Sequence, residues 1–230
     1  MKINEVKQFS KLFDNTFLGL TPTKKSIDEF VDQTLNNEFR SIGIPGYYVP
    51  QVLPRFRGTG VGILSGTGFP YGNEPTEVKI EHFKYWISLG EEITDCELIN
   101  NVMAVKDGAW DYLENELRVM ASIAHEHNKI FKYLIEAPML TDEEIKRVVE
   151  MAMKLDDVDY IKTATGSCGK TTYHHVEVIH SITADEKKIK VAGGVQTLEQ
   201  VEHFLELGAS VFGCSSSKKI LDEYNEKYKK

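Results

Sequence analysis

Two lysines stand where buried strands are expected to end. Lys162 closes the run Val158-Asp159-Tyr160-Ile161, and Lys190 lies within Lys188-Ile189-Lys190-Val191. Burial of an ammonium group is costly unless the group is paired or its pKa falls. If the two side chains converge, each is expected to lower the pKa of the other, which would leave a neutral amine able to form a Schiff base with a carbonyl. From these residues alone, two surface lysines at strand ends remain the alternative.

Carboxylates occupy the ends of other expected strands, namely Asp14, Glu97 and Glu136. Asp95 and Glu97 share one face of a strand because side chains alternate with a period of two. A carboxylate beside two lysines can hold a water or move protons while one lysine is covalently engaged. The alternative is a buried ion-pair network that only fills the interior of the fold.

Two loops of small residues suggest an anion site. The segment Gly213-Cys214-Ser215-Ser216-Ser217 follows the last expected strand and opens the last expected helix, and Ala192-Gly193-Gly194 follows the preceding strand. Small residues let backbone N–H groups approach an anion, and a helix N-terminus supplies positive potential. Serine is also an ordinary helix N-cap, so the pair of loops, rather than either alone, predicts a phosphate site.

The elements that must position these residues alternate along the whole chain. The expected strands are residues 11–14, 41–44, 61–65, 95–99, 131–136, 160–162, 189–191 and 211–213. The expected helices are residues 23–36, 49–56, 75–89, 110–126, 142–154, 173–182, 198–207 and 217–228. Eight strand–helix units in 230 residues predict an α/β fold, a single (β/α)8 TIM barrel over residues 1–230, with a doubly wound sheet as the fallback. In such a barrel the active site lies at the carboxyl ends of the strands, where the residues named above would meet.

Composition removes several classes of function. The net charge of −8 gives no basic signature for nucleic acid, and no apolar run approaches the roughly 18 residues of a membrane span. Three widely spaced cysteines and a first segment without a signal-peptide core favour a reducing cytoplasm. The seven histidines show no metal-ligand pattern, and Gly66-Thr67-Gly68 is no dinucleotide fingerprint, so we expect neither a metal nor a cofactor.

Seven motifs together are specific for one family. They are Phe13-Asp14-Asn15-Thr16, Tyr47-Tyr48-Val49-Pro50, Gly68-Phe69-Pro70-Tyr71-Gly72 with Thr76-Glu77-Val78-Lys79, Ile135-Glu136 with Leu140-Thr141-Asp142-Glu143-Glu144, Ile161-Lys162-Thr163-Ala164-Thr165-Gly166, Lys190-Val191-Ala192-Gly193-Gly194-Val195-Gln196-Thr197 and Gly213-Cys214-Ser215-Ser216. With these motifs the chain resembles the deoxyribose-phosphate aldolase family, whose members are class I, Schiff-base aldolases, nearly from end to end.

The resemblance implies a role for each matched residue. Lys162 would be the Schiff-base lysine, Lys190 the second lysine that lowers the pKa of Lys162 and assists proton transfer, and Asp14 part of the proton network. The substrate phosphate would be bound by Thr165, Gly166, Gly193, Gly194, Gly213, Ser215 and Ser216. The implied protein is a cytoplasmic enzyme, as a homodimer, that cleaves 2-deoxy-D-ribose 5-phosphate to D-glyceraldehyde 3-phosphate and acetaldehyde.

The chain also departs from the family pattern. Glu97 takes the place of the usual catalytic aspartate when the alignment is anchored on Asn101, whereas an alignment forward from Gly90 would choose Asp95. The loop Ser167-Cys168-Gly169-Lys170 replaces a more apolar, glycine-rich stretch, while Gln196 replaces an arginine and Ala192 a serine. These departures keep two alternatives open: an aldolase of the same mechanism for another phosphorylated keto-sugar, and a phosphate-binding barrel without catalysis. A third class, a phosphosugar epimerase, would normally need a metal or paired aspartates at the strand ends, and the expected strand ends offer neither.

Overall fold

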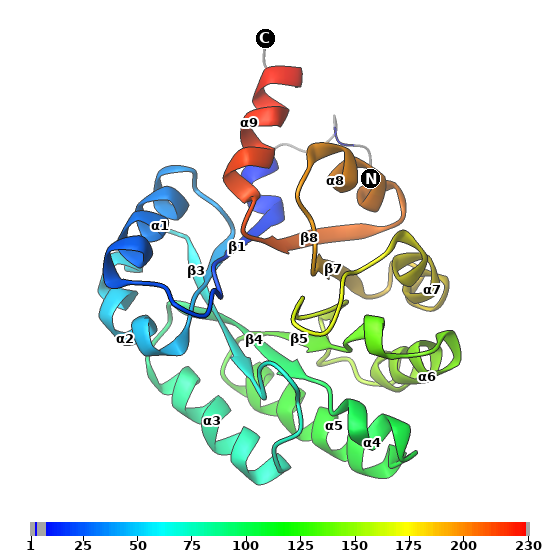
Figure 1. The fold of residues 1–230 in the computed structure, drawn as a ribbon. Coiled ribbons are helices and arrows are strands. Elements are labelled where there is room, and N and C mark those ends of the chain that lie inside the picture. Colours follow the sequence, from blue (N-terminus) through cyan, green and yellow to red (C-terminus); the bar gives the residue numbers. More distant parts are fainter. Residues whose placement is uncertain (1–2, 4–7, 229–230) are drawn as a thin grey trace.

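The computed structural model describes residue 3 and residues 8–228 of the chain. Residues 1–2, 4–7 and 229–230 lie outside this part (Figure 1). Both ends of the expected domain, and most of the segment tested for a signal peptide, therefore fall outside the described residues.

Eight parallel strands close into a barrel in their sequence order, β1 through β8. The strands are β1 (Phe13–Thr16), β2 (Ser41–Gly43), β3 (Gly62–Thr67), β4 (Ile93–Ile99), β5 (Ile130–Leu134), β6 (Tyr160–Lys162), β7 (Lys188–Ala192) and β8 (Ala209–Cys214). The last strand pairs with the first, with Asp14 opposite Gly213, so the sheet has no open edge. The (β/α)8 prediction is confirmed, and the doubly wound alternative is wrong because such a sheet would stay open.

Helices surround the barrel (Figure 1). They are α1 (Lys24–Asn36), α2 (Val49–Val52), α3 (Thr76–Ser88), α4 (Val102–Lys106), α5 (Trp110–Glu126), α6 (Asp142–Met153), α7 (Tyr173–Thr183), α8 (Leu198–Glu206) and α9 (Ser217–Tyr228). Short 3-10 turns lie at Phe9–Leu12, Gly46–Tyr48, Leu53–Phe56 and Ala137–Met139. No helix among the described residues is long and apolar enough to cross a membrane.

Two local differences from the sequence expectation have simple causes. The helix expected over residues 49–56 is α2 followed by a 3-10 turn, where Pro54 lies at the start of the turn and has no N–H for a continuing α-helical bond. The short helix α4 was not predicted, because five residues are too few to show a helical period. It begins after Asn101, whose side chain accepts a hydrogen bond from the N–H of Ala104 at 3.1 Å.

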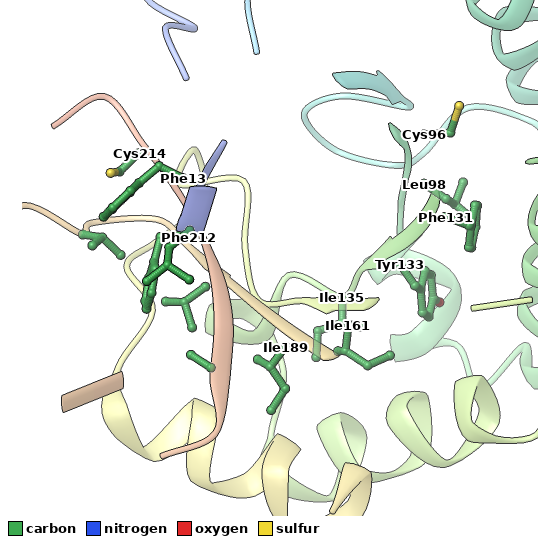
Figure 2. Packing of buried hydrophobic residues seen from close by; sticks show 14 of the residues in the cluster. Phe13, Cys96, Leu98, Phe131, Tyr133, Ile135, Ile161, Ile189, Phe212 and Cys214 are labelled. Carbon is green, nitrogen blue, oxygen red and sulfur yellow. The ribbon is translucent and has the colours of Figure 1, made fainter. Parts of the chain in front are cut away.

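Strand alternation separates an apolar outer layer from a charged interior. Figure 2 shows Leu98, Phe131, Tyr133, Ile161 and Ile189 among the buried apolar side chains that strands β4 to β7 contribute to the hydrophobic core. The residues between them on the same strands are Asp95, Glu97, Lys132, Lys162 and Lys190, and all five are buried. Because successive side chains of a strand point to opposite faces, these charged residues project into the barrel. Their convergence builds the site.

Candidate active site

Glu97 lies between the two predicted lysines. Its Oε2 atom is 2.5 Å from Nζ of Lys162, and its Oε1 atom is 2.7 Å from Nζ of Lys190. The lysines are neighbours in the register of β6 and β7, while Glu97 reaches them from β4. The structure therefore brings together the nucleophile candidate, the second lysine and the carboxylate that the sequence put at three separate strand ends.

Asp14 extends this group toward the opposite end of the barrel. Its Oδ2 atom lies 2.6 Å from Nζ of Lys190 and 2.7 Å from Nζ of Lys132. Its Oδ1 atom accepts hydrogen bonds from Arg40 and Ser41, each at 2.6 Å. Asp14 is fully buried and surrounded by hydrogen-bond donors. Its carboxylate therefore holds the Lys190 ammonium group on the side that does not face Glu97.

Asp95 belongs to a deeper layer of the barrel. Its carboxylate contacts Arg40 at 2.6 Å and Lys132 at 2.8 Å. Of the two carboxylates that the sequence left as candidates, it is Glu97 that contacts both Lys162 and Lys190. Arg40 and Lys132 were missed as members of the network, although Lys132 alternates with the apolar Phe131 and Tyr133 and this pattern could have identified it.

Burial and charge shift the pKa values in opposite directions. Burial lowers the pKa of Lys162 to about 8; Glu97 opposes this shift and Lys190 adds to it. Burial alone would raise the pKa of Glu97, but the charges of Lys162 and Lys190 outweigh it and lower that pKa to about 2. For Lys190 the burial penalty is overcome by Asp14 and Glu97, which raise its pKa. The expectation that both lysines have lowered pKa values is therefore wrong for Lys190, because it has two carboxylate partners.

A cavity of about 430 Å³ opens beside this network at the carboxyl ends of the strands. It is lined by all but one of the predicted phosphate-binding residues, namely Thr165, Gly166, Gly193, Gly194, Gly213 and Ser215. Ser216 does not line it. The loops after β6, β7 and β8 thus meet around one space, close to the first turn of α9, where free backbone N–H groups favour an anion.

Glycines keep the floor of this cavity open. Gly166 and Gly193 both have positive φ angles, and a Cβ atom on Gly166 would lie 3.3 Å from the Cα atom of Gly193. Gly194 also has a positive φ angle, and a Cβ atom there would lie 3.2 to 3.4 Å from the side-chain carbons of Lys170. The stem of the exposed Lys170 therefore passes over Gly194, which lines the cavity.

Glu136 supports the loop after β6. It adopts a left-handed backbone conformation with φ of 57°, and its carboxylate accepts a hydrogen bond from the N–H of Thr165 at 3.1 Å. Burial raises the pKa of Glu136. The sequence placed this residue at a strand end but gave it no role in positioning Thr165, because no pattern reports a contact between two loops.

Among the described residues, no group of three His, Cys, Asp or Glu side chains could hold a metal ion. The charges of the barrel interior are instead arranged as lysine–carboxylate and arginine–carboxylate pairs.

Comparison with known proteins supports the family that the sequence motifs resemble. No protein-family model matches the chain. A deoxyribose-phosphate aldolase of Thermococcus kodakarensis is 31% identical over 219 residues, which cover 94% of this chain and 96% of the relative. The deoxyribose-phosphate aldolase of Streptococcus agalactiae is 33% identical over 218 residues, covering 94% of this chain and 95% of the relative.

Solved structures share the architecture. An aldolase named QR15 superposes with a TM-score of 0.86 at 27% identity, over 97% of this chain and 98% of its own. The tetrameric deoxyribose phosphate aldolase of Aeropyrum pernix has a TM-score of 0.86 at 21% identity, over 95% and 92% of the two chains, and supports the fold alone. With relatives above 30% identity along nearly its whole length, the chain belongs to the deoxyribose-phosphate aldolase family of aldehyde-lyases.

Proposed function

We propose that the protein is a class I aldolase that cleaves 2-deoxy-D-ribose 5-phosphate to D-glyceraldehyde 3-phosphate and acetaldehyde through a Schiff base on Lys162. The observation that carries the proposal is the Glu97 carboxylate, one oxygen of which contacts Lys162 while the other contacts Lys190. This arrangement provides a nucleophile, a proton acceptor and a fixed positive charge within one hydrogen-bonded chain.

Lys162 supplies the nucleophile. With a pKa of about 8, roughly a tenth of the Lys162 side chains are neutral amines at pH 7. Loss of the ammonium charge removes one of the cations that keep the pKa of Glu97 low. Glu97 is therefore a better proton acceptor while Lys162 is a neutral amine than while it is an ammonium group. Lys190, whose pKa is raised by Asp14 and Glu97, stays charged throughout and holds Glu97 in place.

The chemical steps follow from that pairing. The amine of Lys162 adds to C1 of the open-chain sugar, and loss of water gives a cationic iminium. Glu97, directly or through a water, takes the proton of the C3 hydroxyl as the C2–C3 bond breaks, and the iminium accepts the electron pair as an enamine. D-Glyceraldehyde 3-phosphate leaves first. Protonation of C2 and hydrolysis of the iminium then release acetaldehyde and restore Lys162.

The phosphate end of the substrate fits the cavity of about 430 Å³. Gly193, Gly194 and Ser215 would offer backbone N–H groups, and Lys170 a nearby positive charge. Anchoring the phosphate there places the sugar chain over β6 and β7, so that its C1 end can reach Lys162.

A cleavage assay against a panel of sugar phosphates tests the proposal. We expect 2-deoxyribose 5-phosphate to give equal amounts of D-glyceraldehyde 3-phosphate and acetaldehyde, with a higher kcat/KM than any phosphorylated keto-sugar. A keto-sugar phosphate cleaved much faster would replace the substrate and keep the mechanism. Thermal stabilisation by sugar phosphates without turnover of any would identify a binding protein and refute the aldolase assignment.

A further inference from the structure

A second cavity, of about 380 Å³, opens beside Lys162 and Glu97. It lies against the loops and strands β2 and β3, whereas the phosphate cavity lies against the loops after β6, β7 and β8. In the closed barrel β3 is four strands away from β7, so the two cavities extend to opposite sides of the site. The volume of the second cavity falls in the range of about 300–1,000 Å³ that small-molecule sites occupy.

The walls of this second cavity are mostly apolar. They include Ile44, Pro45, Val49, Leu64 and Trp86. Among its lining residues, all within the described part of the chain, Lys162 and Glu97 are the only charged ones. Leu20 also lines the cavity, although its side chain is fully exposed. A surface of this kind favours hydrocarbon and offers little to the hydroxyl groups of a sugar.

The two cavities are adjacent, since both are lined by Thr16, Leu18, Gly19 and Phe69. When a substrate has its phosphate in the first cavity and its carbonyl carbon on Lys162, the second cavity therefore remains open beside that carbonyl carbon. Acetaldehyde, which has only a methyl group besides its carbonyl, would leave most of that space without a partner.

We propose that the second cavity is a donor subsite for straight-chain aldehydes longer than acetaldehyde, with butanal as the representative donor and D-glyceraldehyde 3-phosphate as the acceptor. This inference rests on the proposed Schiff-base function. The alkyl chain of the donor lies against Ile44, Leu64 and Trp86, and the acceptor phosphate lies in the other cavity.

The reaction needs no additional reagent. The Lys162 amine adds to the butanal carbonyl and water leaves, so that a carbon–nitrogen bond replaces the carbon–oxygen bond. The α-carbon gives a proton to Glu97 and becomes the nucleophilic end of an enamine. That carbon attacks the aldehyde carbon of D-glyceraldehyde 3-phosphate, whose oxygen takes the proton. Hydrolysis of the iminium releases a 2-ethyl-branched deoxysugar phosphate and restores the amine.

The size of the expected preference for butanal over acetaldehyde follows from the length of the alkyl chain that the second cavity buries. Each buried methylene group is worth about a fourfold gain in affinity. Butanal has two more methylene groups than acetaldehyde, so its KM is expected to be roughly 15-fold lower in condensation with D-glyceraldehyde 3-phosphate.

Two variants test where the chain binds. A Cβ atom on Gly66 would make only ordinary contacts, at 3.7 Å to Ile99 and 3.9 Å to Phe69, so Gly66→Ala adds a methyl group to the cavity wall without a clash. Leu20→Ser removes an exposed apolar side chain from the rim. Both should bring the ratio of the two donor KM values toward one. Val78→Ser, at an exposed position of α3 outside both cavities, is the matched control and should keep the wild-type ratio.

The experiment measures donor KM values for the wild type and the three variants, together with borohydride trapping of each donor. A lower KM for butanal in the wild type, lost in Gly66→Ala and Leu20→Ser but kept in Val78→Ser, supports the subsite. If acetaldehyde is used and trapped on Lys162 while butanal binds no better, or if the two cavity variants keep the wild-type ratio, the subsite is overturned and the proposed function stands. Absence of a Lys162 adduct with either donor overturns the proposed function and the subsite with it.

Discussion

Glu97 holds the Nζ atom of Lys162 at 2.5 Å from a carboxylate oxygen, although the two residues lie on strands separated by β5. The contact spans the interior of the barrel and depends on the length of the glutamate side chain. The second oxygen of Glu97 contacts Lys190 in the same way, at 2.7 Å. A shorter side chain at this position would have to give up one of the two contacts.

Shortening or neutralising Glu97 should therefore damage catalysis in different ways. Glu97→Asp withdraws the carboxylate by roughly one bond length, and a misplacement on the order of 1 Å can reduce the rate about 10²-fold. Glu97→Gln keeps the length but cannot accept a proton, so we expect kcat to fall by about 10²- to 10⁴-fold. Single-turnover cleavage measures both losses. A Glu97→Gln enzyme with nearly wild-type kcat would show that another group carries the proton.

The pKa of Lys162 sets the pH dependence of Schiff-base formation. The neutral amine is the reactive form, so the rate at low substrate concentration should rise with pH and level off above about 8. In Lys190→Met the neighbouring positive charge is lost while Glu97 remains, and the rise should move to higher pH. The rate of borohydride-trapped adduct formation, measured from about pH 6 to about pH 10 in steps of about half a pH unit, gives the midpoint of this rise. An unchanged midpoint in the variant would contradict the assigned role of Lys190.

Lys170 should act on the phosphate end of the substrate. Its stem lies over Gly194, and a charge-assisted contact with a phosphate is worth about 1.5–3 kcal/mol. Lys170→Met is therefore expected to raise KM for 2-deoxyribose 5-phosphate by about tenfold or more, while unphosphorylated 2-deoxyribose is affected little. Lys25→Met, at an exposed position on α1, serves as the control for loss of a surface charge. An equal effect of Lys170→Met on both sugars would argue against contact with the phosphate.

A second buried ion pair lies outside the active site and should matter for stability. Nζ of Lys79 is 2.9 Å from Oε2 of Glu116, and both side chains are buried. Burial lowers the pKa of Lys79 against the opposing effect of Glu116. Glu116→Gln leaves that ammonium without its carboxylate and is expected to reduce the free energy of unfolding by about 3–5 kcal/mol. The exposed pair of Lys84 and Glu81 provides the control, since Glu81→Gln should cost less than about 1 kcal/mol. Urea denaturation compares the two, and equal losses would contradict the argument.

Much of the fold could be predicted from periodicity and capping residues. The capping boxes expected at Thr141 with Glu144 and at Thr197 with Gln200 are both formed. Strand β6 was predicted with its bounds, Tyr160–Lys162, because apolar residues and a following glycine loop mark it on both sides. The start of β1 was placed two residues early, since the 3-10 turn Phe9–Leu12 also buries apolar side chains, Phe9 and Leu12, and is too short to show a period that separates it from a strand.

The candidate site was harder to predict, because its contacts join distant strands. Strand alternation is enough to place Lys132 inside the barrel, but its partners Asp14 and Asp95 follow only from closure of the sheet. The raised pKa of Lys190 likewise depends on the number of carboxylates that reach it. The second cavity gave no sequence signal, since Ile44, Leu64 and Trp86 resemble ordinary core residues.

The most direct test of the account is borohydride reduction of the protein in the presence of 2-deoxyribose 5-phosphate, followed by intact mass and peptide mapping. We predict one covalent adduct per chain, located on Lys162, and its loss in Lys162→Leu. Lys190→Met serves as the matched variant and should still be labelled on Lys162, more slowly at neutral pH. An adduct on Lys190 or another lysine, or labelling that persists in Lys162→Leu, would contradict the assignment of Lys162 as the nucleophile.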